Sequence, residues 1–191
     1  MSGYKRKDFW VFGYASLMWR PDFDYVEKTP ARLYGYHRSL CISSVVYRGT
    51  PKRPGLVFGL ESGGACRGCA FRVASGRVDE VLGYLRKREL ITGVYREKYL
   101  PVHLLDARGR TKRRANAVCY AVDPTHSQYA GGMNDAARLD RLCRARGKSG
   151  DNLSYVRNTL ESLLEMDVHD SSLIRLWRSV ERRRTRSRRT R

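Results

Sequence analysis

Two short segments carry the residue types that could do chemistry. The first is an apolar run that breaks into small residues, Val11-Phe12-Gly13-Tyr14-Ala15-Ser16-Leu17. A strand that ends in such a loop presents backbone N–H groups in a concave row, which can bind a carboxylate or stabilise an oxyanion. Ordinary turns show the same pattern, so the loop by itself leaves both interpretations open.

The second segment places an acid on the apolar stripe of a predicted helix. The apolar residues recur at intervals of three and four: Val78, Val81, Leu82 and Leu85. Glu89 follows Leu82 by seven residues, which puts its carboxylate on the same stripe. Burial would raise the pKa of this carboxyl group, which suits a general base near neutral pH. A salt bridge with a neighbouring arginine, or a frayed helix end, would explain the same position.

The cysteines and histidines do not form a metal-binding pattern. Cys66 and Cys69 have the spacing of half a zinc site, but the sequence has no second pair and its four histidines are scattered singly. We interpret the pair as small residues on a strand, with a redox dithiol as the alternative. Five cysteines without a predicted secretion signal are typical of reduced thiols in the cytoplasm.

The elements that must position these segments are unevenly distributed along the chain. Strands are predicted over residues 9–12, 31–37, 40–47, 55–60, 68–73, 99–105 and 117–122. Helices are predicted over 78–89, around 139–143, over 153–164 and over 173–180. Most strands precede most helices, which favours an α+β fold over a doubly wound parallel sheet. We expect a small closed or nearly closed mixed β-barrel flanked by helices.

Composition separates a globular body from a basic end. The 191 residues are 41% hydrophobic, enough to bury a core, and carry 38 Lys and Arg against 19 Asp and Glu. Residues 181–191 hold seven Arg and one Glu, so we predict a domain over 1–180 and a disordered Arg-rich tail over 181–191. Such a tail indicates weak contact with a polyanion, or a tolerated terminal extension.

No membrane segment or leader is predicted. No apolar run approaches the roughly 20 residues of a transmembrane helix. The basic N-terminus precedes only a short apolar stretch that lacks a small-residue cleavage site, so we expect no signal peptide and a cytoplasmic protein.

Seven stretches of the chain resemble the ChaC-like γ-glutamylcyclotransferases, in the order that the family has them. Residues 11–19 (VFGYASLMW) resemble its VFGYGSLxW signature, and residues 47–55 (YRGTPKRPG) resemble its RGTPxxPG loop. The other five are 35–38 (GYHR), 68–73 (GCAFRV), 88–95 (RELITGVY), 128–131 (QYAG) and 149–155 (SGDNLSY). The resemblance spans roughly residues 9–180. It departs at Ala15, which stands where the family has glycine; a positive φ there would make alanine costly.

The resemblance implies a carbon–nitrogen lyase of the amidine-lyase class that cleaves glutathione into 5-oxoproline and cysteinylglycine, without a cofactor or a metal. The α-amine of the substrate attacks its own γ-amide carbonyl, so the enzyme must fold a flexible chain and move a proton. By this resemblance Glu89 is the general base and acid. The implied substrate-binding residues are Val11, Phe12, Gly13, Tyr14, Ala15, Ser16, Leu17, Arg48 and Tyr129.

Other functions remain open at this point. A cyclotransferase for other γ-glutamyl amines or amino acids would share the fold and the base. A basic nucleic-acid-binding protein is the alternative from another class, motivated by the net charge of +19. Against it, the sequence has no basic helix with recognisable docking geometry, no aromatic stacking motif and no zinc finger. Ser16 as an acyl-enzyme nucleophile lacks the His–Asp partner pattern that such chemistry uses.

Overall fold

Residues 9–189 are described by the computed structural model of the chain, which separates into two units. The first unit takes residues up to Ser39 and Gly59–Ser127. The second takes Leu40–Phe58 and the residues from Gln128 onward. Two long strands, β2 (Glu27–Ser44) and β3 (Gly55–Val73), contribute residues to both units.

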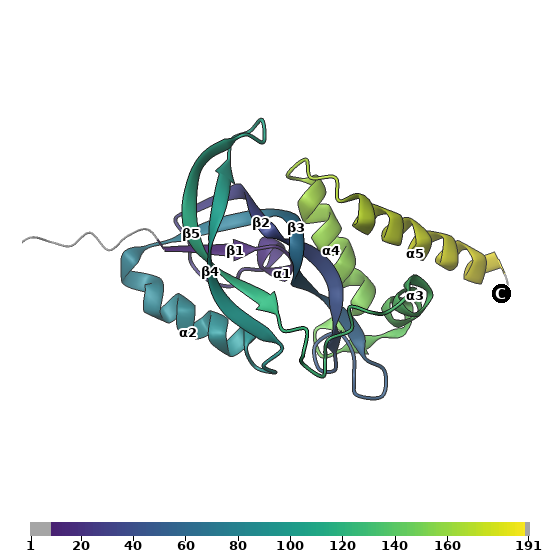
Figure 1. The fold of residues 1–191 in the computed structure, drawn as a ribbon. Helices are drawn as coiled ribbons and strands as arrows, with labels where there is room; N and C mark the ends of the chain where they lie inside the picture. The colour runs from purple at the N-terminus through teal and green to yellow at the C-terminus, as the bar shows by residue number, and fades with distance from the viewer. Residues whose placement is uncertain (1–8, 190–191) are drawn as a thin grey trace, which may run out of the picture. The chain divides into compact units, whose positions relative to one another are not determined.

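Five strands of the described chain form a closed barrel in the order β1-β3-β2-β4-β5. The other three strands are β1 (Phe9–Gly13), β4 (Tyr95–Leu105) and β5 (Thr111–Val122). β1 pairs antiparallel with β3 and parallel with β5, so the barrel is mixed. Together with the helices that accompany it in Figure 1, this confirms the predicted α+β fold with a mixed barrel and flanking helices.

The apolar sequence of β1 follows from its position in the barrel. Every residue from Trp10 to Gly13 is buried, so this strand has no polar face. Continuous rather than alternating hydrophobicity is what a strand covered on both faces requires. In β5 only the second half is buried, from Ala117 onward, which matches its change from basic to apolar residues.

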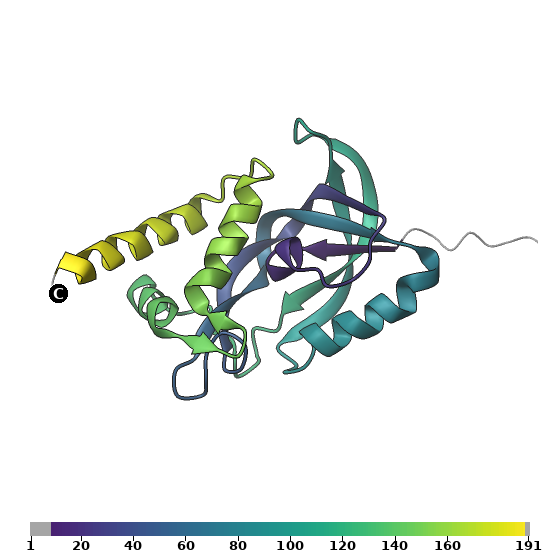
Figure 2. The ribbon, with the colours of Figure 1, turned by 180° about the vertical axis from the view of Figure 1, so that it is seen from behind.

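Helix α2 (Val78–Glu89) follows the short 3₁₀ turn η1 (Ser75–Arg77) and lies alongside barrel strands in Figures 1 and 2. Its first turn carries two acids and its last turn three basic residues, which complements the helix dipole. Val81 and Leu85 are its buried anchors, as the apolar spacing predicts. Gly93, with φ of +74°, turns the chain back into β4.

The second unit contains three helices among its described residues. They are α3 (Asp135–Arg144), α4 (Asn152–Leu164) and α5 (Ser171–Arg189), and α3 is followed by the two-residue strands β6 (Arg146–Gly147) and β7 (Gly150–Asp151). The side chain of Asp151 accepts a hydrogen bond from the Ser154 N–H, which makes it the N-cap of α4.

The structure differs from two expectations about where elements end. The predicted strands 31–37 and 40–47 fall largely within the single strand β2, which ends at Ser44. The predicted strands 55–60 and 68–73 both lie in β3, because Gly63 and Gly64 take positive φ within this strand without ending it. Helix α5 continues through residues 181–189, where composition predicts a disordered tail, because arginine is a good helix former and the buried Leu173 and Val180 anchor the preceding turns. The domain boundary at residue 180 stays a prediction.

None of the described helices combines the length and the hydrophobicity that a bilayer-spanning helix needs.

Candidate active site

The loop after β1 is tightly packed: Gly68 beside it admits no side chain without a backbone shift, and Gly13 leaves little room for one. A Cβ on Gly68 would lie 2.3 Å from the carbonyl oxygen of Gly13, and a Cβ on Gly13 would lie 3.0 Å from the Cβ of Leu17. The chain then enters helix α1 (Ser16–Trp19). Arg38 holds the loop from the side, since its guanidinium donates to the carbonyl oxygen of Tyr14.

The side chains of the loop differ in their exposure. Those of Val11 and Phe12 are fully buried, and Tyr14, Ala15 and Leu17 are almost so. The Tyr14 hydroxyl donates to the carbonyl oxygen of Tyr120 at 2.8 Å, which ties the loop to β5. Ser16 is less buried than these neighbours.

Ala15 has a ψ of −122° and does not take a positive φ. Its φ is −142°, which lies outside the left-handed region that favours glycine. The alanine in place of the family's glycine therefore carries no positive-φ strain here.

Glu89 is the last residue of α2, and its side chain is only 15% exposed. Burial raises the pKa of its carboxyl group, and the positive charge of Arg88 opposes part of that rise. A carboxyl group with a raised pKa suits proton transfer near neutral pH. The structure thus places Glu89 in the environment that its position on the apolar stripe predicts.

Arg88 connects this acid to the loop. Its Nε lies 3.1 Å from Oε1 of Glu89, and its Nη2 donates to Oγ of Ser16 at 3.1 Å. One guanidinium therefore contacts both the candidate base and the first residue of α1. The sequence suggests only that a neighbouring arginine could pair with Glu89, because the contact of Arg88 with Ser16 joins residues 72 positions apart.

A second group of polar side chains lies near Glu89, and no pattern in the sequence predicts it. The Tyr120 hydroxyl donates to Oε2 of Glu97 at 3.3 Å, and Arg86 pairs with Glu97 at 2.7 Å. Burial raises the pKa of Tyr120 strongly, and the charges of Glu97 and then Glu89 add to the rise. Tyr120 therefore remains a neutral hydrogen-bond donor beside the candidate base. Its position in the apolar half of β5 makes it look like an ordinary core residue.

Arg48 and Tyr129 belong to the second unit. The nearly buried Arg48 guanidinium donates to the carbonyl oxygen of Asp151 at 3.2 Å and to Oγ of Ser154 at 3.3 Å, and it lies over the ring of Tyr155. These contacts fasten the RGTP segment to the start of α4. Tyr129 forms an isolated antiparallel bridge with Ile42. Their predicted contact with substrate stays a prediction.

Metal ligands do not gather anywhere in the described part of the chain. Within residues 9–189 no group of three or more His, Cys, Asp or Glu side chains is arranged to hold a metal ion. Cys66 and Cys69 are buried residues of β3, which confirms their placement on a strand.

Comparison with known proteins agrees with this fold. Residues 9–183 match the family described as ChaC-like protein. The chain belongs to the ChaC-like family. Among curated relatives of this ChaC-like protein, the glutathione-specific gamma-glutamylcyclotransferase of Escherichia coli K12 is 33% identical over 91% of this chain and 73% of its own length. The human glutathione-specific gamma-glutamylcyclotransferase 1 is 34% identical over 77% of this chain and 66% of its own.

Solved structures share the fold of this ChaC-like chain. A yeast gamma-glutamyl cyclotransferase specific to glutathione has a TM-score of 0.83 at 21% identity, covering 92% of this chain and 96% of its own. A structure described as gamma-glutamyl cyclotransferase has a TM-score of 0.55 at 13% identity, with coverages of 89% and 86%.

Proposed function

We propose that this protein is a glutathione-specific γ-glutamylcyclotransferase, an enzyme that converts glutathione into 5-oxoproline and cysteinylglycine. Family membership and the names of the relatives support the reaction and its substrate. The observation in the structure that carries the proposal is the largely buried Glu89 carboxyl group, which one guanidinium links to the loop after β1.

In this proposal Glu89 first accepts a proton from the substrate and later gives it back. Its carboxylate takes a proton from the α-ammonium group of the substrate, and the free amine then attacks the γ-carbonyl carbon. A carbon–nitrogen bond closes the five-membered ring, and the carbonyl becomes an oxyanion. As the bond to the cysteinyl nitrogen breaks, the carbonyl re-forms and Glu89 returns the proton to the departing amine. The ring nitrogen gives its second proton to that amine through solvent, so the lactam keeps one N–H and cysteinylglycine leaves with an ammonium group. The raised pKa of Glu89 supports both steps, because the same group must accept and release the proton.

The loop over residues 11–17 has the second role in the proposal. Backbone N–H groups of Gly13 to Leu17 would face the γ-glutamyl oxygen, and the buried Val11 and Phe12 would support them from the barrel. Arg48 and Tyr129 are the proposed further substrate contacts. The ring closure is an internal displacement that requires no cofactor. We also propose a cytoplasmic location, which fits the odd number of cysteines, five, in the sequence.

The experiment is to incubate the purified protein with glutathione and to quantify 5-oxoproline and cysteinylglycine. The proposal expects equal amounts of both products. A panel of γ-glutamyl amino acids and γ-glutamyl amines, measured in parallel, tests the specificity. Faster turnover of the panel than of glutathione would favour the broader cyclotransferase, and no 5-oxoproline from any substrate would refute the function.

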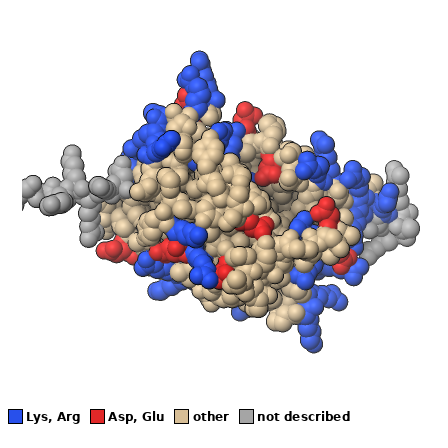
Figure 3. Space-filling model, viewed as in Figure 1, with Lys and Arg blue, Asp and Glu red and all other residues tan. Residues whose placement is uncertain are grey.

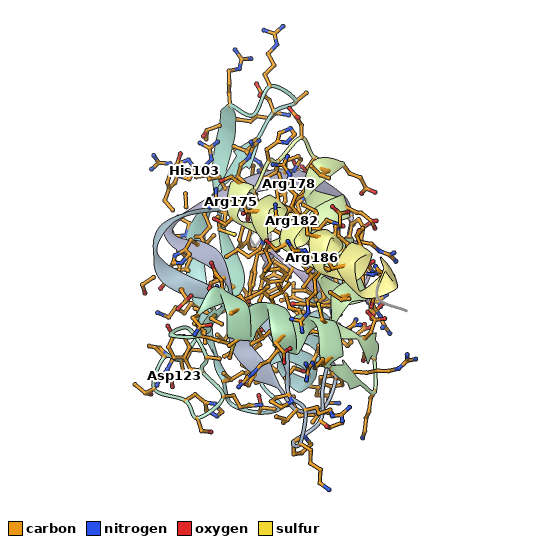
Figure 4. The ribbon with its side chains drawn as sticks, turned by 90° about the vertical axis from the view of Figure 1, so that its right-hand side faces the viewer. His103, Asp123, Arg175, Arg178, Arg182 and Arg186 are labelled. Carbon is orange, nitrogen blue, oxygen red and sulfur yellow. The ribbon has the colours of Figure 1, made fainter. Side chains whose placement is uncertain are left out.

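We further propose that the Arg-rich C-terminal segment makes weak contact with a polyanion, for which the phosphate backbone of a nucleic acid is the case to test. The observation that favours it is a row of exposed arginines along α5, labelled in Figure 4: Arg175, Arg178, Arg182 and Arg186. Their spacing of three and four residues puts them on one face of the helix. Arginine presents a planar fork that matches phosphate oxygens, which fits this partner.

A further inference from the structure

Arg88 contacts three separate parts of the candidate site. Its Nη1 donates to the carbonyl oxygens of Arg20 at 2.8 Å and Pro21 at 3.1 Å, just after α1 ends. Its Nη2 reaches Oγ of Ser16 at the start of α1, and its Nε faces the Glu89 carboxylate. The side chain is only 19% exposed. These contacts span both ends of α1 and the end of α2.

Helix geometry alone does not bring the side chains of Arg88 and Glu89 together. Consecutive residues on a helix point in different directions, so neighbours in sequence do not normally pair. Here the guanidinium is held by groups outside the last turn of α2, and those groups turn it towards the carboxylate. Glu89 is the last residue of α2. No further turn of this helix follows it that could contact its carboxylate.

Tyr84 adds a support from one turn earlier in α2. Its hydroxyl accepts a hydrogen bond from Nη1 of Arg88 at 2.8 Å, and the guanidinium carbon lies 5.9 Å from the centre of its ring. A guanidinium has five N–H donors in a rigid plane, and the two on Nη1 are shared among its three acceptors. A lysine would keep the charge but would present one ammonium group on a flexible stem.

We propose that Arg88 is a positioning residue of this site: its guanidinium fixes the Glu89 carboxylate relative to Ser16 and the loop after β1. This inference rests on the proposed function. It assigns Arg88 the task of holding the base where the substrate amine must lie. Misplacing a catalytic group by about 1 Å is enough to cost on the order of a hundredfold in rate.

The charged groups that face Arg88 predict a second effect of removing it. Glu89 lies against Nε, and Asp22 lies 3.6 Å from Nη1 and also pairs with the Arg20 side chain. The Arg88 charge lowers the pKa of Glu89, so an uncharged residue would let that pKa rise further. The acidic limb of the activity profile would then move to higher pH, because the base would be protonated earlier as the pH falls.

The test compares Arg88→Lys and Arg88→Gln with the wild type in glutathione turnover across pH. Lys87→Gln is the matched control, because it removes one charge from the exposed neighbouring residue on α2. We expect both Arg88 variants to lose at least about tenfold in kcat with a smaller change in KM. We expect only Arg88→Gln to shift the acidic limb to higher pH, and Lys87→Gln to behave as the wild type.

Wild-type kcat in Arg88→Lys would overturn the inference, and so would a loss confined to KM. Tyr84→Phe covers the case in which the Arg88 variants do not fold, since it removes one contact of the guanidinium. It is expected to lower kcat with KM unchanged, and wild-type kcat in a folded Tyr84→Phe protein would also overturn the inference. A wild-type protein that forms no 5-oxoproline would refute the proposed function and this inference with it. An active wild type with an inactive Glu89→Gln variant and a normal Arg88→Lys variant would refute the positioning role alone.

Discussion

Glu89 concentrates the chemistry of the proposed site in one carboxyl group. Replacing it by glutamine keeps the size of the side chain but removes its ability to accept a proton. Because general acid–base catalysis contributes on the order of a hundredfold to ten-thousandfold, we expect Glu89→Gln to lose at least about a hundredfold in 5-oxoproline formation. Circular dichroism and thermal unfolding check that the fold is kept. Near-normal turnover in the folded variant would reject Glu89 as the base.

The same carboxyl group makes stability depend on pH in a predictable direction. Its folded-state pKa is raised by burial, so folding favours the protonated form. Below the unfolded pKa the group is neutral in both states and has no effect; above it, the folded protein resists ionisation and loses stability. We therefore expect Glu89→Gln to raise the unfolding temperature more at about pH 8 than at about pH 4, on either side of the ordinary carboxyl pKa. A difference that shrinks as pH rises would contradict the burial of Glu89.

Ala15 allows a direct test of the loop geometry. Its φ of −142° lies outside the left-handed region that favours glycine, and glycine adds freedom to the unfolded chain. We expect Ala15→Gly to cost up to about 1 kcal/mol in the free energy of unfolding and to leave turnover equal or higher, through the space that it opens. Urea unfolding and steady-state kinetics measure the two effects. A large fall in turnover would mean that the alanine itself shapes the substrate site.

At the scale of elements, the approach of β3 to the loop limits what the barrel tolerates. β1 and β3 are in register with Gly13 opposite Cys69, and a Cβ on the preceding Gly68 would lie 2.3 Å from the Gly13 carbonyl oxygen. Backbone cannot yield as a flexible side chain can. We expect Gly68→Ala to destabilise the protein by about 1–3 kcal/mol, the usual cost of overpacking, and to reduce turnover.

Gly76→Ala is the matched control for this prediction. No heavy atom lies within 4 Å of a Cβ built on Gly76, which is an exposed residue of η1. Urea unfolding of both variants gives the comparison, and equal stability of the two would show that β1 and β3 separate more easily than their register indicates.

Local patterns predicted the elements that are determined by their own residues. The continuous apolar run gave β1, and the three-and-four spacing of apolar residues gave α2 with Glu89 at its end. Positions that depend on distant contacts were not predictable. The contact of Arg88 with Ser16 depends on the packing of α2 beside the loop after β1. The contact of Tyr120 with Glu97 depends on the register of β4 and β5, which places the two residues opposite each other. The two strands predicted over 55–60 and 68–73 form one strand in the structure. Gly63 and Gly64 lie between them with positive φ, and such a glycine can bend a strand as well as end it.

At the scale of the whole molecule, the net charge of +19 does not follow from the proposed chemistry. In the first unit, Lys and Arg gather at the tip of the β4–β5 hairpin, and in the second they line α5, as Figure 3 shows. These exposed positive charges would attract anionic glutathione over long distances only at low ionic strength. Under physiological conditions salt screens exposed charges beyond about 8 Å. The ordered row on α5 is a more specific feature than the excess charge itself.

This row gives the proposed nucleic-acid contact a test that is independent of catalysis. Arg178 and Arg182 are exposed residues in the middle of the row, and replacing both by glutamine removes two charges while keeping helix-forming side chains. The control is Arg108→Gln combined with Arg114→Gln. It removes two exposed charges from the β4–β5 hairpin, one in the turn between the strands and one in β5. We expect the α5 variant to bind a fluorescent RNA oligonucleotide more weakly than the wild type. The slope of log K against log salt concentration should fall by the equivalent of about two phosphate contacts. Glutathione turnover is expected to stay at the wild-type level. Equal weakening in the control would show that binding follows net charge alone, and tighter binding to anionic lipid vesicles than to RNA would assign the row to a membrane surface instead.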